Sequence, residues 1–298
     1  MHFYNLYGVN LSSEIEIPLL DKINTPKTTD IEISFSNSLE NKSLMHKDRK
    51  DNVISLNRSL IFSRKNKLVF EIINGKKIII HKLSKDLNNY EISVILLNAP
   101  LGYCLYQQKK LVLHSCGISN YDGAYLFMGE SGTGKSSLAA SFLEDFSFIT
   151  EDVATIEFKN NSVNIFQGPP YVKLDESILD NFKFSKSTSI KILSDRLKRT
   201  AFKTKNNLKK VHKIKKIYVL EWGDVFSISN IENKKLLATY LLNTFTAYPY
   251  ESCKESSKIL LTHFSELVKK IDFFLLTRDK KRRFKDNSLI LEHILKND

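Results

Sequence analysis

The sequence predicts a mixed α/β fold, with a β-rich section over residues 1–88 and an α/β body over residues 89–298. Three observations lead to this prediction. The first section contains alternating apolar residues and an Asn-Gly turn. The second contains an apolar strand, a glycine-rich loop and an amphipathic segment in succession. The chain has only 10 Gly, and six of them lie between Gly102 and Gly134, so this region is the first place to look for a functional site.

The β-rich section is defined by short alternating segments. Residues 31–35 alternate between apolar and polar types, which is typical of a half-buried strand. Residues 67–73 and 76–81 flank Asn74-Gly75, and an Asn-Gly pair between two apolar runs is the strongest short signal for a β-hairpin. The polar residues 37–52 are expected to form a loop.

The second section alternates between helical and extended patterns. Residues 89–109 are predicted to be helical, with a break before Pro100 because the residue before a proline disfavours helix. Two helices are expected after residue 221, and His263, beside an apolar stripe of the second, is interpreted as structural. The remaining predicted elements are strands at 110–118, 123–128, 146–150, 153–158, 163–166 and 217–221, and a helix at 135–145.

The loop after the strand 123–128 carries a phosphate-binding motif. Residues 129–136 fit the pattern G-x-x-x-x-G-K-[ST], in which glycines let backbone N–H groups point at phosphate oxygens. In this motif Lys135 reaches the β- and γ-phosphates and the Ser136 hydroxyl can ligate Mg²⁺. The residues expected to bind the nucleotide are Gly129, Glu130, Ser131, Gly132, Thr133, Gly134, Lys135, Ser136 and Ser137.

An acidic pair is expected to return to this loop. The predicted helix would run ~16 Å away from it at 1.5 Å per residue, and the five-residue strand would return ~17 Å at 3.3 Å per residue. Glu151 and Asp152 therefore fall beside the phosphates, where a carboxylate can hold Mg²⁺ or accept a proton. The alternative is a helix cap or a surface pair. His114, taken alone, is more typical of a structural histidine, and Ser115 and Cys116 have no base placed near them for a catalytic triad.

Composition excludes several classes of protein. Hydrophobic residues make up 42% of the chain and charged residues 26%, which is ordinary for a globular domain. No apolar run approaches the ~18 residues of a membrane span, and the N-terminal residues do not resemble a secretory signal. The three Cys have no C-x-x-C spacing, which argues against a disulfide framework or a zinc site. A cytoplasmic location is therefore expected.

The net charge of +12 is concentrated in one stretch. Residues 183–216 hold 13 Lys and Arg and one acid, so this stretch carries the whole excess. Three interpretations stay open: a solvated loop in a lysine-rich chain, a surface for an acidic protein or peptide, or a nucleic-acid surface.

Three segments together resemble a known family. They are residues 113–116 (LHSC), 129–137 (GESGTGKSS) and 149–153 (ITEDV), within a similarity that runs from about Asn98 to Leu174. This region resembles the kinase domain of HPr kinase/phosphorylase. It is more similar still to the HPr-kinase-like proteins found beside peptide-modification genes, including kinases of lasso-peptide precursors.

The resemblance implies a P-loop kinase core related to HPr kinase and phosphoenolpyruvate carboxykinase, and phosphoryl transfer to a serine hydroxyl. It implies catalytic roles for His114, Lys135 and Asp152, with Asp152 as the base and Glu151 as metal or orienting support. Ser136 and Glu151 are the expected metal ligands. The glycine-rich signature of the bifunctional enzymes is missing after the acidic pair, where residues 167–170 (QGPP) stand. Phosphorylase activity, HPr as substrate and a hexamer are therefore not predicted.

The resulting hypothesis is an enzyme that uses ATP and Mg²⁺ to phosphorylate a Ser or Thr hydroxyl of a protein or peptide. The alternatives are a non-catalytic ATP-binding switch, a small-molecule kinase and, more distantly, a nucleic-acid-associated ATPase. No membrane partner is expected, and a homo-oligomer is left open. Lys198 and Arg199, which resemble a basic pair of the family, are where recognition of an acidic substrate is expected.

Overall fold

The structure, a computed structural model, divides into two units. It describes residues 1–36, 53–54, 58–63, 68–82, 87–182, 189–193, 198–204, 209–244, 254–282 and 284–296. Unit 1 comprises Met1–Val112 and Thr246–Leu261, and unit 2 comprises Leu113–Phe245 and Thr262–Asp298. The expected loop at 37–52 lies outside the described residues. None of the described helices is long and apolar enough to cross a membrane.

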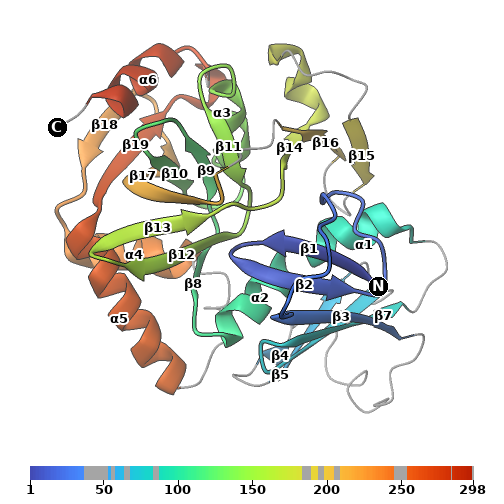
Figure 1. Cartoon of the computed structure of the whole chain (residues 1–298). Coiled ribbons are helices and arrows are strands. Elements are labelled where there is room, and N and C mark those ends of the chain that lie inside the picture. Colours follow the sequence, from blue (N-terminus) through green and yellow to red (C-terminus); the bar gives the residue numbers. More distant parts are fainter. Residues whose placement is uncertain are drawn as a thin grey trace. The chain divides into compact units, whose positions relative to one another are not determined.

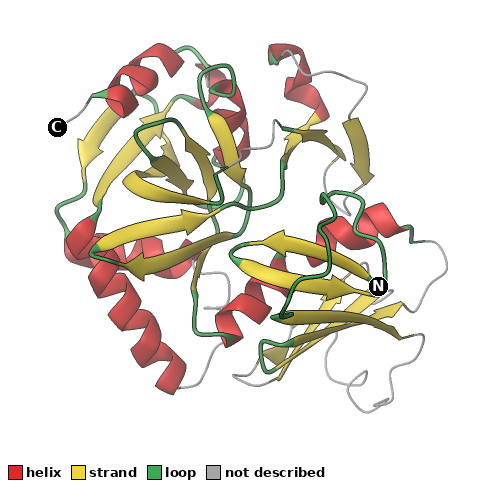
Figure 2. Ribbon diagram, in the orientation of Figure 1, coloured by secondary structure: helices red, strands yellow, loops and turns green. Residues whose placement is uncertain are grey.

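Unit 1 is built on one sheet, with the predicted hairpin near its middle (Figures 1 and 2). The turn between β6 and β7 contains Asn74 at φ 53° and Gly75 at φ 64°, the left-handed geometry that favours an Asn-Gly pair. The hairpin prediction is therefore confirmed. The strands, in sheet order, are β1 (His2–Leu6), β2 (Val9–Ser13), β3 (Ile31–Ser36), β7 (Lys77–Lys82), β6 (Leu68–Ile73), β5 (Arg58–Ser63) and β4 (Val53–Ile54).

Two helices belong to this first unit, which moves the boundary from the predicted residue 88 to residue 112. They are α1 (Asn89–Leu96) and α2 (Ala99–Gln107), separated before Pro100 as expected. Helix α2 is fixed to the hairpin turn because the Gly75 N–H donates to Gln107 Oε1 at 2.7 Å and Gln108 Nε2 donates to the Gly75 carbonyl at 2.7 Å. The predicted helical region is therefore confirmed. The sequence pattern alone does not show which sheet the two helices pack against.

Unit 2 has a mixed sheet around the long strand β17 (Val211–Trp222). This strand pairs in parallel with β10 (Ala124–Met128) and with β19 (Asp272–Arg278), and antiparallel with β13. On the other side of β10 lie β9 and then β11. The sheet's other strands are β9 (Cys116–Ser119), β11 (Ser147–Thr150), β12 (Ala154–Lys159), β13 (Ser162–Phe166) and β18 (Ser227–Asn230). The chain enters unit 2 through β8 (Leu111–Leu113).

Helices and short segments complete the second unit. Helices α3 (Lys135–Ser141) and α6 (Asn287–Leu295) contribute apolar side chains to the same core cluster. Helices α4 (Lys234–Thr244) and α5 (Lys254–Lys270) are the two helices predicted after residue 221, and α5 belongs to the second unit only from Thr262 onward. His263 of α5 stacks on Phe158 at 5.5 Å between ring centroids, which supports its interpretation as structural. The 3₁₀ turns are Glu176–Asn181 and Lys280–Arg282.

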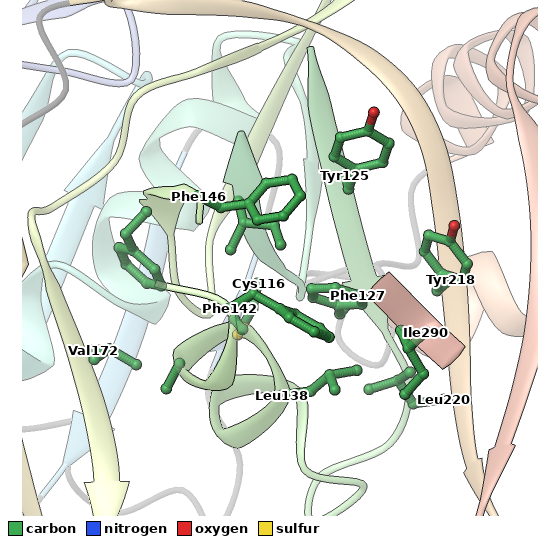
Figure 3. Close-up of a cluster of buried hydrophobic side chains, with 14 of the residues drawn as sticks. Cys116, Tyr125, Phe127, Leu138, Phe142, Phe146, Val172, Tyr218, Leu220 and Ile290 are labelled. Carbon is green, nitrogen blue, oxygen red and sulfur yellow. The ribbon is translucent and has the colours of Figure 1, made fainter. Parts of the chain in front are cut away.

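The core of unit 2 is aromatic (Figure 3). Phe127 of β10 is fully buried and contacts Tyr218 of β17 and Phe142 after α3, with ring centroids 5.8 Å and 6.3 Å apart. Leu138 of α3 and Ile290 of α6 belong to the same cluster. This packing fixes the strand that precedes the glycine-rich loop and the helix that follows it.

The basic stretch is largely extended where the structure describes it. It supplies β15 (Ser189–Leu193), β16 (Lys198–Lys203) and the start of β17, and the first two join β14 (Tyr171–Asp175) in a separate antiparallel sheet. Lys216 donates to the carbonyls of His293 at 3.2 Å and Lys296 at 2.7 Å, where a cation is favourable at the end of α6. The solvated-loop interpretation is therefore wrong for these strands, and at least Lys216 has a structural role.

Replacement of Phe127 by alanine tests the packing of the core. The change removes a fully buried ring, and we expect Phe127→Ala to lower the free energy of unfolding by roughly 3–5 kcal/mol. Tyr121→Ala is the matched control, because Tyr121 is 92% exposed and its loss should cost less than about 0.5 kcal/mol. Urea unfolding followed by circular dichroism measures both values. Equal midpoints for the two variants would contradict this description of the core.

Candidate functional site

The glycine-rich loop joins β10 to α3 and needs its glycines for two different reasons. Gly132 and Gly134 have φ of +90° and +84°, a region that residues with a Cβ rarely adopt. A Cβ on Gly134 would also lie 3.1 Å from the Arg278 guanidinium, whereas one on Gly132 would meet nothing within 4 Å. Inside the loop Lys135 Nζ donates to the carbonyls of Gly129 at 2.8 Å and Glu130 at 3.1 Å. The lysine of the motif therefore points into the loop.

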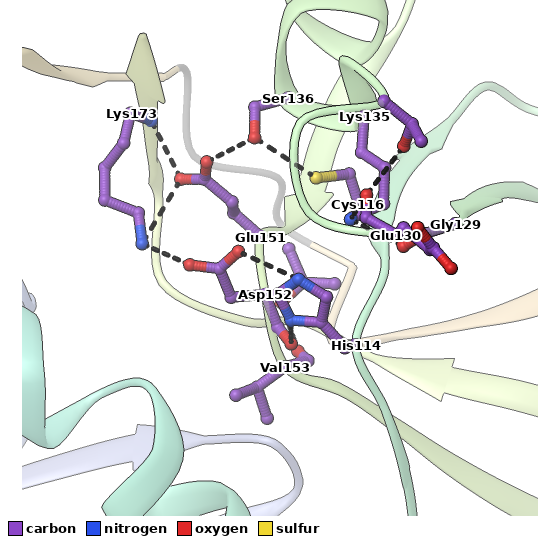
Figure 4. A network of polar contacts seen from close by, with 12 residues as sticks. His114, Cys116, Gly129, Glu130, Lys135, Ser136, Glu151, Asp152, Val153 and Lys173 are labelled. Atoms are coloured by element: carbon purple, nitrogen blue, oxygen red, sulfur yellow. Dashed lines mark hydrogen bonds and ion pairs between the residues drawn. The ribbon is translucent and has the colours of Figure 1, made fainter. Parts of the chain in front are cut away.

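The acidic pair lies beside this loop, as the helix and strand lengths predicted (Figure 4). Helix α3 and strand β11 are each shorter than expected, so the chain still returns to its starting level. Ser136 Oγ donates to Glu151 Oε1 at 2.6 Å, although 15 residues separate them. Glu151 is buried, with 4% of the residue exposed. The pair is thus neither a helix cap nor a surface feature.

Asp152 sits in a strained turn. It has φ +64°, and the Val153 N–H donates to the Glu151 carbonyl at 2.8 Å, which closes a tight three-residue turn around Asp152. Thr150 Oγ1 holds the same turn by donating to the Val153 carbonyl at 2.6 Å. Such backbone strain costs of order 1–3 kcal/mol and is found mostly where a side chain must be aimed.

His114 is held next to Asp152. The expected single strand over 110–118 is interrupted here, and the His114 N–H donates to the Thr244 carbonyl at 2.6 Å. His114 Nδ1 lies 3.1 Å from the Asp152 carbonyl, and Nε2 lies 3.9 Å from Asp152 Oδ1. A carbonyl only accepts, so Nδ1 carries the proton and the neutral ring presents a lone pair at Nε2. Withdrawal from water lowers the pKa of His114 and outweighs the opposing charge of Asp152, which favours this neutral form.

Lys173 of β14 is the main residue of the site that sequence reasoning did not assign. Its ammonium contacts the Asp152 carboxylate and lies 3.9 Å from Glu151 Oε2, and its backbone N–H donates to Glu151 Oε2 at 2.8 Å. The side chain is 5% exposed. The available signal was a single lysine in an otherwise apolar strand, Tyr171-Val172-Lys173-Leu174, because a lysine there must be paired to be buried.

The charges of this cluster shift one another's protonation. Burial raises the pKa of Glu151 to about 7, although Lys173 opposes the shift. Burial also acts to raise the pKa of Asp152, but the charge of the Lys173 ammonium prevails and the pKa is lowered. Burial lowers the pKa of Lys173, yet the two carboxylates raise it above its ordinary value. Near neutral pH Asp152 is therefore a carboxylate paired with an ammonium, whereas burial favours the protonated form of Glu151 more than that of an ordinary carboxyl.

Two more residues missed by sequence reasoning hold the far side of the loop. Trp222, at the end of β17, donates its Nε1–H to the Gly132 carbonyl at 3.0 Å. Arg278, at the end of β19, donates to the Thr133 carbonyl at 2.5 Å and stacks over the Trp222 ring at 4.7 Å. Both parallel strands thus end on carbonyls of the loop, so the Gly132 and Thr133 carbonyls already have donors.

The residues next to Ser136 fit a magnesium ion better than a zinc ion. Ser136 Oγ and Glu151 Oε1 are 2.6 Å apart, close to the spacing of adjacent oxygens around Mg²⁺, on the order of 3 Å for Mg–O distances of about 2.1 Å. Within the described ranges no group of three or more His, Cys, Asp or Glu side chains could hold a metal. Cys116 Sγ is 3.7 Å from Ser136 Oγ, but burial raises its pKa to about 12, so it stays a thiol.

Comparison with known proteins gives a distant structural likeness. No family model matches the sequence, and no curated protein matches it. Among solved structures, the HPr(Ser) kinase/phosphatase from Coxiella burnetii is similar over 62% of this chain and 90% of that chain, with 12% identity and a TM-score of 0.31. The fold and site define a mixed α/β protein with a glycine-rich loop facing an acidic pair. The functional proposal rests on those side chains.

The pairing of Lys173 with the acidic residues is tested by a double-mutant cycle. Lys173→Met leaves uncompensated buried carboxylates, so we expect the free energy of unfolding to fall by about 3–5 kcal/mol. Adding Asp152→Asn should restore at least half of that loss, because the unpaired charge is removed. Lys270→Met is the control: its partly exposed pair with Glu266 should contribute about 0.5 kcal/mol or less. Additive effects of the Lys173 and Asp152 changes would contradict the pairing.

Proposed function

We propose that this protein is an ATP- and Mg²⁺-dependent kinase that phosphorylates a Ser or Thr hydroxyl of a protein or peptide. The observation that carries the proposal is the convergence of Ser136, Glu151, Asp152 and His114 at the start of α3, next to the glycine-rich loop. The motif supplies phosphate binding, and the acidic pair supplies one group for the metal and one for the acceptor. The resemblance of three sequence segments to HPr-kinase-like proteins supports the same choice.

The loop and Lys135 would hold the phosphates. Lys135 now donates to two carbonyls of the loop, and the same three-donor ammonium can turn to the β- and γ-phosphate oxygens. Ser136 and Glu151 would ligate Mg²⁺, which would neutralise charge on the phosphates. A metal there favours the carboxylate form of Glu151, because the cation lowers the cost of its charge.

Asp152 would act on the acceptor. Its carboxylate orients the hydroxyl in line with the γ-phosphorus and accepts the hydroxyl proton as the acceptor oxygen–phosphorus bond forms and the bond to ADP breaks. The ion pair with Lys173 makes Asp152 a weak base, so its main contribution is orientation, as expected for a loose transition state. His114 Nε2, with its lone pair 3.9 Å from Asp152 Oδ1, is a second acceptor at the same place.

Asp152→Asn separates catalysis from nucleotide binding. The amide keeps the shape of the side chain but cannot take the proton, so we expect phosphoryl transfer to fall by about 10²-fold or more. The Kd for ATP should stay within threefold of wild type. The assay is transfer of label from γ-labelled ATP to a library of Ser- and Thr-containing peptides, with ATP binding measured by calorimetry.

Two controls complete that experiment. Lys135→Met should weaken ATP binding at least tenfold, because Lys135 is the cation of the loop. Binding of ATP without turnover in the wild type would favour the switch, and labelling only of small molecules would favour a small-molecule kinase. Stimulation by DNA or RNA with a steep salt dependence would favour the nucleic-acid-associated ATPase.

Arg199 is the residue through which we propose that an acidic acceptor is recognised. It lies on β16 opposite Asp175 of β14, the strand that carries Lys173. Burial lowers the pKa of Lys135, and the charge of Arg199 adds to that effect, which places Arg199 within electrostatic reach of the catalytic groups.

We also propose a cytoplasmic location for the protein, since the described cysteines, Cys104 and Cys116, are free thiols.

Charge reversal tests this recognition. Arg199→Glu should raise the KM for an acidic acceptor peptide at least fivefold and leave the Kd for ATP within twofold. Lys285→Glu reverses a charge at an exposed position near α6 and serves as the control. Steady-state kinetics with acidic and neutral peptides measure the difference. Equal kinetics of Arg199→Glu and wild type on the acidic peptide would remove Arg199 from acceptor recognition.

A further inference from the structure

A cavity of about 300 Å³ lies in unit 2 between the glycine-rich loop and helix α4. Two other cavities of this unit lie at the opposite end of α3, around Phe146 and Ser147, away from the loop. The cavity beside the loop is lined by residues of the loop, of the end of β17 and of α4: Gly129, Glu130, Thr133, Val219, Leu220, Glu221, Trp222, Tyr240, Asn243 and Thr244.

Its walls combine flat rings with hydrogen-bonding groups. Trp222 is half-buried and is held by the Gly132 carbonyl and the stacked Arg278, so its indole is fixed in orientation. Tyr240 donates its hydroxyl proton to Glu221 Oε1 at 2.5 Å, which fixes that carboxylate, and Asn243 adds an exposed amide. Aromatic faces with a few oriented polar groups are the usual lining of a site for a planar heterocycle.

The order of the strands gives a bound nucleotide a direction. The acidic pair follows β11, on the β9 side of β10, whereas β17 lies on the opposite side. A nucleotide whose γ-phosphate meets Asp152 therefore leaves the loop with its other end directed over β17. Trp222 and Glu221, at the carboxyl end of β17, are where ligands of open α/β sheets bind.

We propose that this cavity receives the purine base of the bound nucleotide, stacked on the Trp222 indole, with the Glu221 carboxylate accepting a hydrogen bond from its exocyclic amino group. The inference rests on the proposed function, because the phosphates of the same nucleotide occupy the loop. It adds a base site to a motif that by itself binds only phosphates. Adenine and guanine both carry an amino group, whereas hypoxanthine does not.

The test compares ATP with tripolyphosphate, each with Mg²⁺, by calorimetry on the full chain. Wild type should bind ATP at least tenfold more tightly than tripolyphosphate, and GTP more tightly than ITP. Asn243→Trp fills the cavity from an exposed position. The affinity for ATP should therefore fall to that for tripolyphosphate, while the Kd for tripolyphosphate stays within twofold of wild type. Lys235→Trp places the same bulk at another exposed position of α4 that does not line the cavity, and it should change neither ligand.

A second readout uses the chain's single tryptophan. ATP should quench Trp222 emission in the wild type, and tripolyphosphate should quench it less, because only ATP brings a ring against the indole. Tyr240→Phe frees the Glu221 carboxylate without changing the cavity's shape and should lower the preference for ATP over ITP, which keeps the test open if Asn243→Trp does not fold.

The outcomes separate the two proposals. Equal affinity of wild type for ATP and tripolyphosphate, or equal weakening of both by Asn243→Trp, would overturn the base site while leaving the loop as a phosphate site. Failure of the folded wild type to bind either ligand would overturn the proposed function, and the base site with it.

Discussion

Two adjacent carboxylates, Glu151 and Asp152, are withdrawn from water, and the Lys173 ammonium is the charge that makes their burial tolerable. An isolated buried carboxylate costs several kcal/mol, so the pair could not be kept at the loop without a cation or protons. Lys173 contributes twice, since its ammonium meets Asp152 and its backbone N–H meets Glu151. Through these contacts β14, a strand of a separate small sheet, is tied to the strand that carries the acids. The position of that sheet relative to the loop therefore depends on the charge balance of the site.

The same balance explains why Asp152 can occupy a strained turn. Its left-handed φ is unfavourable for a residue with a Cβ, and the turn persists only because neighbouring contacts determine it. The Lys173 ammonium pairs with the Asp152 carboxylate, and His114 Nδ1 donates to the Asp152 carbonyl. Thr150 Oγ1 closes the turn by donating to the Val153 carbonyl. The turn directs the carboxylate toward the Lys173 ammonium and the His114 ring. An orienting role suits such a group better than a strongly basic one, since Lys173 keeps it ionised.

The local parts of this arrangement could be predicted from the sequence, and the long-range parts could not. The glycine pattern predicts the loop and the buried strand before it. The rises per residue of a helix and a strand predict that Glu151 returns to Ser136. The long-range residues come from distant strands: Lys173 lies 21 residues after Asp152, Arg278 lies 149 residues after Gly129, and Trp222 falls between them in the chain. Local periodicity does not show which strands are neighbours. The predicted strand at 217–221 proved to be the end of the longer β17, whose first half lies in the basic stretch. In that half, polar and apolar residues alternate, as in Val211-His212-Lys213-Ile214, which is typical of a strand, but the high density of lysine is equally typical of a charged loop.

The loop is therefore held from two sides by different kinds of interaction. On the β11 side the neighbours are polar and charged: a hydroxyl, two carboxylates and a lysine gather where charge would move in the proposed phosphoryl transfer. On the β17 side the neighbours are planar groups, the Trp222 indole and the Arg278 guanidinium. They stack on each other and donate hydrogen bonds to carbonyls of the loop. These bonds occupy the Gly132 and Thr133 carbonyls, whereas a phosphate would take hydrogen bonds from the loop's N–H groups. A nucleotide has the same two ends, one charged and one aromatic, so a single ligand orientation satisfies both sides of the loop.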